Sequence, residues 1–136
     1  MKDLLPETKS QETLAVELGR LLGDHKGGQV LVMDMRQLNF WTDFFVIATV
    51  TSNIHLSGLD RHIKEFARDN DIEIIRRSPK PNSDQEWSII DMGDIVIHLM
   101  TEKARSFFEL ERLWSSAPLI LEAPDYKAVS YSSKSS

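Results

Sequence analysis

Residues 43–49 read Asp-Phe-Phe-Val-Ile-Ala-Thr, and the run is aromatic, β-branched and apolar at odd and even positions alike. A strand with one solvent-exposed face would alternate apolar and polar residues. This run therefore predicts a central strand covered on both faces. Thr51, Ser52 and Asn53 follow, and these residue types cap helix N-termini. The next apolar residues recur at helical spacing: Leu56, Leu59, Ile63 and Phe66. A buried strand leading into an amphipathic helix predicts a sheet with helices packed on it.

The rest of the chain supplies similar elements. Residues 11–25 carry an apolar stripe and predict a first helix; residues 30–33 and 72–75 predict short strands; residues 101–114 predict a last helix. With 136 residues, the chain can bury one core. We therefore expect one α/β (α+β) domain with a mixed sheet of about five strands. Its expected boundaries are a lead-in over 1–10, the domain over 11–117 and a polar, flexible tail over 118–136.

Residues 86–91 and 94–100 flank Met92-Gly93 and predict an antiparallel hairpin with a two-residue loop. In that register Trp87 pairs with His98. The amphipathic helices would pack on one face of the hairpin, and the other face would combine a tryptophan, a histidine and a methionine. The residues of this second face are Trp87, Ile89, Asp91, Asp94, Val96, His98 and Met100. Such a face is either a docking surface or core beneath another helix, and the pattern leaves both interpretations open.

Composition excludes several classes of protein. The chain has no cysteine, which removes disulfide frameworks, thiolate zinc sites and cysteine nucleophiles. The net charge of −5 argues against a nucleic-acid-binding protein whose whole surface contacts phosphate backbones, and it favours a basic partner. No apolar run approaches the roughly 20 residues of a bilayer span, and the N-terminus lacks the features of a signal peptide or presequence. We therefore expect a cytoplasmic protein.

The sequence gives only weak support for a catalytic site. Asp91 and Asp94, with Asp34, could form a two-metal carboxylate site, but carboxylates beside a glycine turn are common in hairpins and no glycine-rich phosphate loop precedes a helix. His98 stands alone on its strand, so a hydrogen-bonded histidine is the better interpretation. We expect no cofactor, no metal ion and no catalytic residue.

Four blocks of the sequence carry a resemblance. They are residues 42–49; Thr51-Ser52-Asn53 with His55; Trp87 leading to Asp91-Met92-Gly93-Asp94-Ile95-Val96-Ile97-His98; and Ala104-Arg105 followed by residues 108–114. In order and spacing they strongly resemble the ribosomal silencing factor family, RsfS or Iojap, over residues 11–114. The resemblance implies a small α/β domain reminiscent of nucleotidyltransferases without known catalysis, in the cytoplasm of a bacterium.

The resemblance also implies a partner and a mechanism. Family members bind ribosomal protein L14 on the large subunit, block joining of the small subunit and repress translation when nutrients are scarce. They also form homodimers. Carried onto this sequence, the contact uses Trp87, Met100, Phe108 and Leu110 as apolar anchors, with His98 beside them. Asp94 and Glu111 would meet basic partner side chains, and Arg105 would orient those carboxylates.

Two departures and two rival functions accompany the resemblance. Val50 replaces the family's usual glycine, and the loop from Ser78 to Glu86 carries prolines instead of a glutamate-glycine pair. Arg76, Arg77 and Lys80 could make a minor contact with ribosomal RNA. The rivals are a nucleotidyltransferase-like enzyme that uses Asp91 and Asp94, and a ribosome assembly factor that does not silence.

Overall fold

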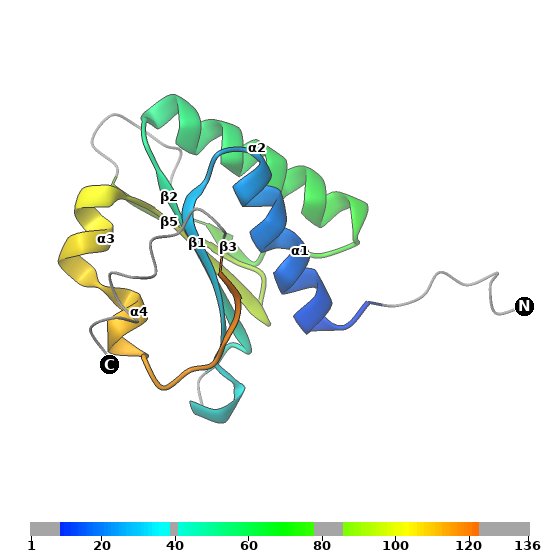
Figure 1. Ribbon diagram of the computed structural model, residues 1–136. Coiled ribbons are helices and arrows are strands. Elements are labelled where there is room, and N and C mark those ends of the chain that lie inside the picture. The colour runs from blue at the N-terminus through cyan, green and yellow to red at the C-terminus, as the bar shows by residue number, and fades with distance from the viewer. Residues whose placement is uncertain (1–8, 39–40, 78–85, 123–136) are drawn as a thin grey trace, which may run out of the picture.

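The computed structural model describes residues 9–38, 41–77 and 86–122. Within them, six strands form one mixed sheet in the order β3-β4-β5-β2-β1-β6 (Figure 1). The strands are β1 (Gly28–Asp34), β2 (Phe44–Val50), β3 (Arg76–Arg77), β4 (Trp87–Asp91), β5 (Ile95–Thr101) and β6 (Leu119–Glu122). The helices are α1 (Gln11–Asp24), the 3-10 turn η2 (Arg36–Leu38), α2 (Asn53–Asp69), α3 (Glu102–Phe108) and α4 (Leu110–Leu113).

The predicted central strand is confirmed as β2. All seven of its residues are buried. It pairs in parallel with β5 on one side and antiparallel with β1 on the other. Both faces of β2 are covered, which explains why its sequence shows no alternation.

Helices α1 and α2 cover the first face of the sheet (Figure 1). The side chain of Ser10 accepts a hydrogen bond from the Thr13 N–H and begins α1, and Ser52 accepts from the His55 N–H and begins α2. Both helices bury the stripes predicted for them against apolar side chains of β1, β2 and β5. This cluster is the larger of the two cores, because two long helices close it.

Helices α3 and α4 cover the second face, where a smaller core contains Met33, Met35, Phe45, Val96 and Met100. The predicted last helix is therefore two short helices. Glu109, between them, has a left-handed backbone with φ 47° and ψ 53°, which ends α3. A non-glycine residue rarely adopts this conformation, and it turns the chain so that α4 starts in a new direction.

The hairpin of β4 and β5 is confirmed, but its register is not. Trp87 pairs with Met100 and Asp91 pairs with Val96, which shifts the ladder by two residues from the predicted pairing. The connection is longer because the Asp91 carboxylate accepts the Gly93 N–H at 2.8 Å and the Met92 N–H donates to the Ile95 carbonyl at 2.9 Å. A shift of two preserves the face of every side chain, so the predicted faces hold.

The two outer strands differ from the prediction. The short strand expected over 72–75 is wrong, because pairing with β4 begins only at Arg76. The polar tail expected from residue 118 is wrong for Leu119–Glu122, which pair with β1 as β6. Strand β3 takes the place of the strand expected over 72–75, and β6 raises the number of strands from about five to six. The lead-in over 1–8 and the chain after Glu122 lie outside the described residues.

Gly19 lets α1 approach the sheet closely. A Cβ atom at this position would lie 2.7 Å from side-chain carbons of Val32 and Leu121. We expect Gly19→Ala to lower the free energy of unfolding by roughly 1–3 kcal/mol, because Val32 is stiff and held in the core. Urea denaturation measures this.

Gly23 provides the matched control in the same helix. Nothing lies within 4 Å of a Cβ built there. We expect Gly23→Ala to raise the free energy of unfolding by about 0.5 kcal/mol through helix propensity. Equal effects of the two substitutions would contradict the close approach of α1.

Candidate partner-binding surface

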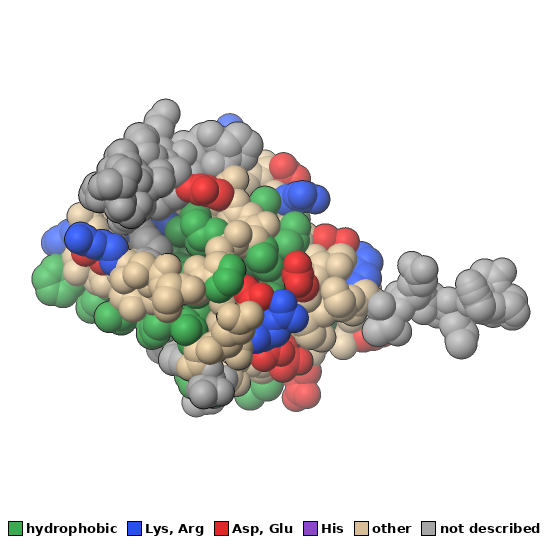
Figure 2. Space-filling model, turned by 60° about the horizontal axis from the view of Figure 1, so that its bottom comes forward, with side chains coloured by type: hydrophobic (Ala, Val, Ile, Leu, Met, Phe, Trp, Pro, Cys, Tyr) green, Lys and Arg blue, Asp and Glu red, His purple; other side chains and the backbone are tan. Residues whose placement is uncertain are grey.

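Large apolar side chains stand exposed on the second side of the molecule. Phe107 and Phe108 of α3 are 78% and 46% exposed, and Leu113 of α4 is 66% exposed. Next to α3, β4 contributes the half-buried Trp87 and the exposed Ile89. We name Trp87, Ile89, Phe107, Phe108 and Leu113 the aromatic surface. Figure 2 shows hydrophobic side chains gathered on the side of the molecule that carries α3 and α4.

Three rings of this surface touch in series. The Trp87 and Phe108 ring centroids are 4.6 Å apart, and those of Phe108 and Phe107 are 4.9 Å apart in an edge-to-face arrangement. These separations are typical of favourable aromatic pairs. The rings therefore form one continuous apolar strip between β4 and the end of α3.

The local sequence explains why these rings stay outside. Thr101 caps α3 by accepting the Ala104 N–H at 3.1 Å. Within α3 only Ala104 and Arg105 are buried. Phe107 and Phe108 lie in the last turn of α3, after these two buried residues, and both are exposed there.

His98 lies beneath this surface. It is 6% exposed, and its Nδ1 accepts a hydrogen bond from the Trp87 indole N–H at 3.1 Å. Phe45 packs edge-on against the imidazole with centroids 4.6 Å apart. Burial lowers the pKa of His98 to about 4, and the nearby Arg105 cation acts in the same direction. The ring is therefore neutral at physiological pH.

This shifted pKa predicts a pH dependence of stability. An unfolded histidine has a pKa of about 6.5. Between pH 6.5 and 4, His98 is therefore protonated in the unfolded chain and neutral in the folded chain. We expect His98 to reduce the free energy of unfolding by about 2 kcal/mol between pH 7 and pH 5. The difference in urea stability between the wild type and His98→Asn across this range measures the effect. A difference that does not change with pH would contradict it.

Arg105 connects α3 to the sheet from within. It is 2% exposed, and its guanidinium donates to Thr49 Oγ1 at 2.8 Å and to the Gln29 carbonyl at 2.7 Å. Gln29 has a left-handed φ of 48° beside an irregularity in the pairing of β1 with β2. One buried side chain thereby joins α3, β2 and the start of β1.

The eight predicted contact residues divide into four groups. Trp87 and Phe108 belong to the aromatic surface. Asp94 is exposed in the β4–β5 loop, at the opposite end of β5 from α3. Glu111 lies in α4, and its side chain is outside the description. The remaining four, His98, Met100, Arg105 and Leu110, are buried.

These placements correct part of the prediction. Met100 and Leu110 were expected as anchors for a partner, but they belong to the second core and support the surface from below. Arg105 was expected to orient carboxylates at the contact, but it bonds Thr49 and Gln29 inside the fold. The reason is that α3 and α4 cover the second hairpin face, one of the two interpretations that the sequence left open. Phe107, Leu113 and Ile89 were not among the predicted contact residues, although Ile89 was placed on the second hairpin face. The neighbouring apolar residues gave no sign that Phe107 and Leu113 are exposed.

The carboxylates proposed for a rival enzyme have structural partners. Asp91 is buried and accepts the Gly93 N–H. The Arg36 guanidinium bonds Asp34 at 2.7 and 2.9 Å and holds the pKa of that carboxyl below its usual range. Within the described ranges, no group of three or more histidine, aspartate or glutamate side chains is placed to hold a metal ion.

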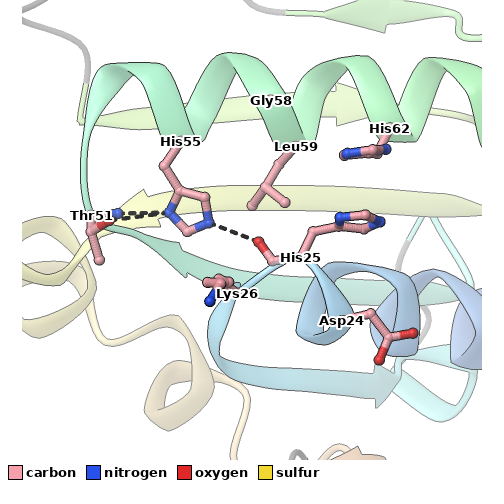
Figure 3. Close-up of a pocket in the computed structure, with 8 residues that line it drawn as sticks. All are labelled: Asp24, His25, Lys26, Thr51, His55, Gly58, Leu59 and His62. Carbon is pink, nitrogen blue, oxygen red and sulfur yellow. Dashed lines mark hydrogen bonds between the residues drawn. The ribbon is translucent and has the colours of Figure 1, made fainter.

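A separate pocket of about 560 Å³ lies at the junction of α1 and α2 (Figure 3). His55 bridges it: Nδ1 accepts the Thr51 N–H at 3.1 Å, and Nε2 contacts the His25 carbonyl at 3.1 Å. The rings of His25 and His62 stack with centroids 3.6 Å apart. Nε2 of His55 therefore joins α2 to the end of α1, whereas Nδ1 bonds the backbone just before α2. Of the loop residues considered for RNA contact, Arg76 and Arg77 form β3 with undescribed side chains, and Lys80 lies outside the described residues.

Comparison with known proteins decides the family. The family model described as ribosomal silencing factor during starvation, RsfS, matches residues 7–136. The chain belongs to this family. The chloroplast Iojap protein of Arabidopsis thaliana is 34% identical to it over 76% of this chain and 42% of the relative. RsfS of Treponema pallidum is 33% identical over 74% of this chain and 88% of the relative.

A solved structure agrees with the RsfS fold. The crystal structure of a Chromobacterium violaceum protein has a TM-score of 0.67 at 26% identity and covers 80% of this chain and 87% of its own. The chain spans less than half of its chloroplast relative's length but most of its bacterial relatives' length. In the described part of the chain, no helix is long and apolar enough to cross a bilayer. The predicted family and its mixed α/β sheet are confirmed; the likeness to nucleotidyltransferases stays a prediction.

Proposed function

We propose that this RsfS family member is a non-catalytic factor that keeps ribosomal subunits apart. It binds the large subunit through ribosomal protein L14, occupies a site that the small subunit needs, and represses translation under nutrient limitation. The observation that supports this function best is the aromatic surface, an exposed apolar strip on a domain that belongs to a family of ribosomal silencing factors.

The aromatic surface has the composition of a protein contact. Aromatic side chains are enriched in protein interfaces, where a few residues, tryptophan prominent among them, contribute most of the binding energy. Trp87, Phe108 and Phe107 present three rings in one strip. Exposed charges of both signs lie around it, including Lys103, Glu102 and Arg112. An apolar centre with a charged rim favours a folded protein such as L14 over a bare phosphate backbone.

The proposed mechanism is steric. A bound domain of this size cannot share its site with the small subunit, so the two compete by mass action and no bond is broken. The net charge of −5 favours encounter with a basic ribosomal protein. Asp94 and the Glu111 side chain remain proposed partners for basic residues of L14. Away from the ribosome, we propose that two copies pair through the aromatic surface, in the cytoplasm of a bacterium.

Sedimentation of purified subunits tests the function. Large and small subunits are mixed at a magnesium concentration that joins them, with and without a molar excess of the protein. The proposal expects separated subunits and the protein in the large-subunit fractions. Unchanged joining with the protein bound to large subunits would instead support the assembly factor, and absence of binding would remove both.

Trp87 is expected to be a main anchor of the contact. Trp87→Ala should weaken large-subunit binding by roughly 2 kcal/mol or more, about 30-fold, and leave the fold intact because Trp87 is half-buried. Co-sedimentation at a series of protein concentrations measures the dissociation constant. Trp41→Ala is the control, since Trp41 is an exposed tryptophan next to the start of β2, the end of the sheet away from α3. Equal losses for both variants would contradict a specific role for Trp87.

A further inference from the structure

His98 is buried directly below the aromatic surface and has one polar contact with it. Its Nδ1 accepts the Trp87 indole N–H at 3.1 Å. The opposite nitrogen, Nε2, is buried and has no hydrogen-bond partner among the residues that the structure describes. Because Nδ1 accepts, the proton of the neutral ring lies on Nε2. The fold thus buries a donor that it does not use.

Stability does not explain an imidazole at this position. An unpaired buried N–H destabilises a fold, whereas an apolar side chain of similar size would bury no donor. Phe45 already packs edge-on against the ring, and the second core beside it is apolar, with the buried Arg105 as the nearby charge. What the imidazole supplies, and an apolar residue would not, is an acceptor for Trp87.

The hydrogen bond acts on the strip of rings. Trp87 lies on β4 opposite Met100 of β5, and its side chain is half-buried. Its indole contacts Phe108, and Phe108 contacts Phe107. The bonded N–H restricts rotation of the half-buried indole about its side-chain torsions, and the indole in turn packs against Phe108. The bond from Trp87 to His98 therefore fixes the first member of the strip.

We propose that His98 is the positioning residue of the aromatic surface: as a hydrogen-bond acceptor it holds the Trp87 indole so that Trp87, Phe108 and Phe107 are preformed for a protein partner. This proposal rests on the function proposed above. Its physical effect is preorganisation, because a partner that meets an ordered strip loses less side-chain entropy on binding. His98 itself touches no partner in this mechanism.

Three substitutions separate the acceptor from simple packing. His98→Asn keeps an oxygen acceptor near the place of Nδ1. His98→Gln places its amide near Nε2 instead, and His98→Leu removes every polar atom. We expect His98→Leu and His98→Gln to weaken large-subunit binding five- to tenfold, and His98→Asn to bind within twofold of the wild type.

The indole N–H resonance of Trp87 provides a readout that does not depend on binding. It is assigned in a ¹H–¹⁵N spectrum by its loss in Trp87→Phe. We expect His98→Asn to keep a hydrogen-bonded shift, and His98→Leu and His98→Gln to move the resonance toward that of a free indole. Thermal unfolding confirms that each variant is folded, and His98→Gln serves in place of His98→Leu if the latter does not fold.

Two results would overturn the proposal. The first is an unchanged indole resonance in folded His98→Leu or His98→Gln. The second is equal weakening of binding by His98→Asn and His98→Gln, which would assign the effect to packing. If the wild type binds no large subunits, the proposed function fails, while the indole resonance still decides whether His98 positions Trp87.

Discussion

Replacing both Phe107 and Phe108 by serine is expected to weaken large-subunit binding by at least about 100-fold and to restore subunit joining. Both rings are exposed, at 78% and 46%, so their loss removes contact area for a partner and little core. Aromatic anchors in protein interfaces contribute about 2 kcal/mol or more each, and 100-fold corresponds to about 2.7 kcal/mol. Co-sedimentation with large subunits measures the affinity, and urea denaturation should show a stability close to that of the wild type.

The control for this double variant is Ile54→Ser. Ile54 is 85% exposed on α2, which covers the opposite face of the sheet. If binding depends on the aromatic surface, Ile54→Ser binds as the wild type does. Retention of binding within threefold by the phenylalanine variant would place the contact elsewhere.

Arg105→Met is expected to lower the free energy of unfolding by about 3 kcal/mol or more. The methionine can fill most of the volume, but the Gln29 carbonyl and the Thr49 hydroxyl lose donors at 2.7 and 2.8 Å. Each buried polar group left unsatisfied costs about 1–3 kcal/mol. Because Arg105 joins α3 to β1 and β2, we also expect α3 to loosen and large-subunit binding to weaken with it.

Urea denaturation of Arg105→Met measures the loss, with Arg112→Met as the matched control. Arg112 is exposed and pairs with Glu109 at 3.1 Å within one turn, a contact that typically contributes about 0.5 kcal/mol or less. Similar losses for the two arginines would show that the buried bonds of Arg105 contribute little.

The central part of the fold follows closely from local patterns. The run at 43–49 is apolar at both parities and becomes the fully buried β2. The apolar stripe after Ser52 becomes the buried side of α2, and the cap is Ser52, one of the three residues predicted as possible caps. In the hairpin, even an error of two residues in the register left every side chain on its predicted face. The periodicity of apolar residues is a strong signal because it indicates which side of a helix or strand is buried.

The edges of the sheet were predicted less well. Strand β3 has two residues and β6 has four, and both are too short to show a period. Whether such a segment pairs depends on an open edge of another strand, which for β6 is β1. A local side-chain bond also explains why the hairpin connection has three residues instead of the predicted two, because the Asp91 carboxylate accepts the Gly93 N–H.

At the candidate surface, the sequence predicted on which face a residue lies but not whether that residue is exposed. Residue order alone placed Trp87, His98 and Met100 on one face of the hairpin, because alternation along a strand is a property of the backbone. It could not assign Met100 and Leu110 to the core or Phe107 to the outside. Those outcomes depend on where α3 ends, at the left-handed Glu109, and on the Arg105 bonds that set α3 against the sheet. A periodic pattern reports the side on which a residue lies, whereas its exposure depends on which distant segment packs over that side.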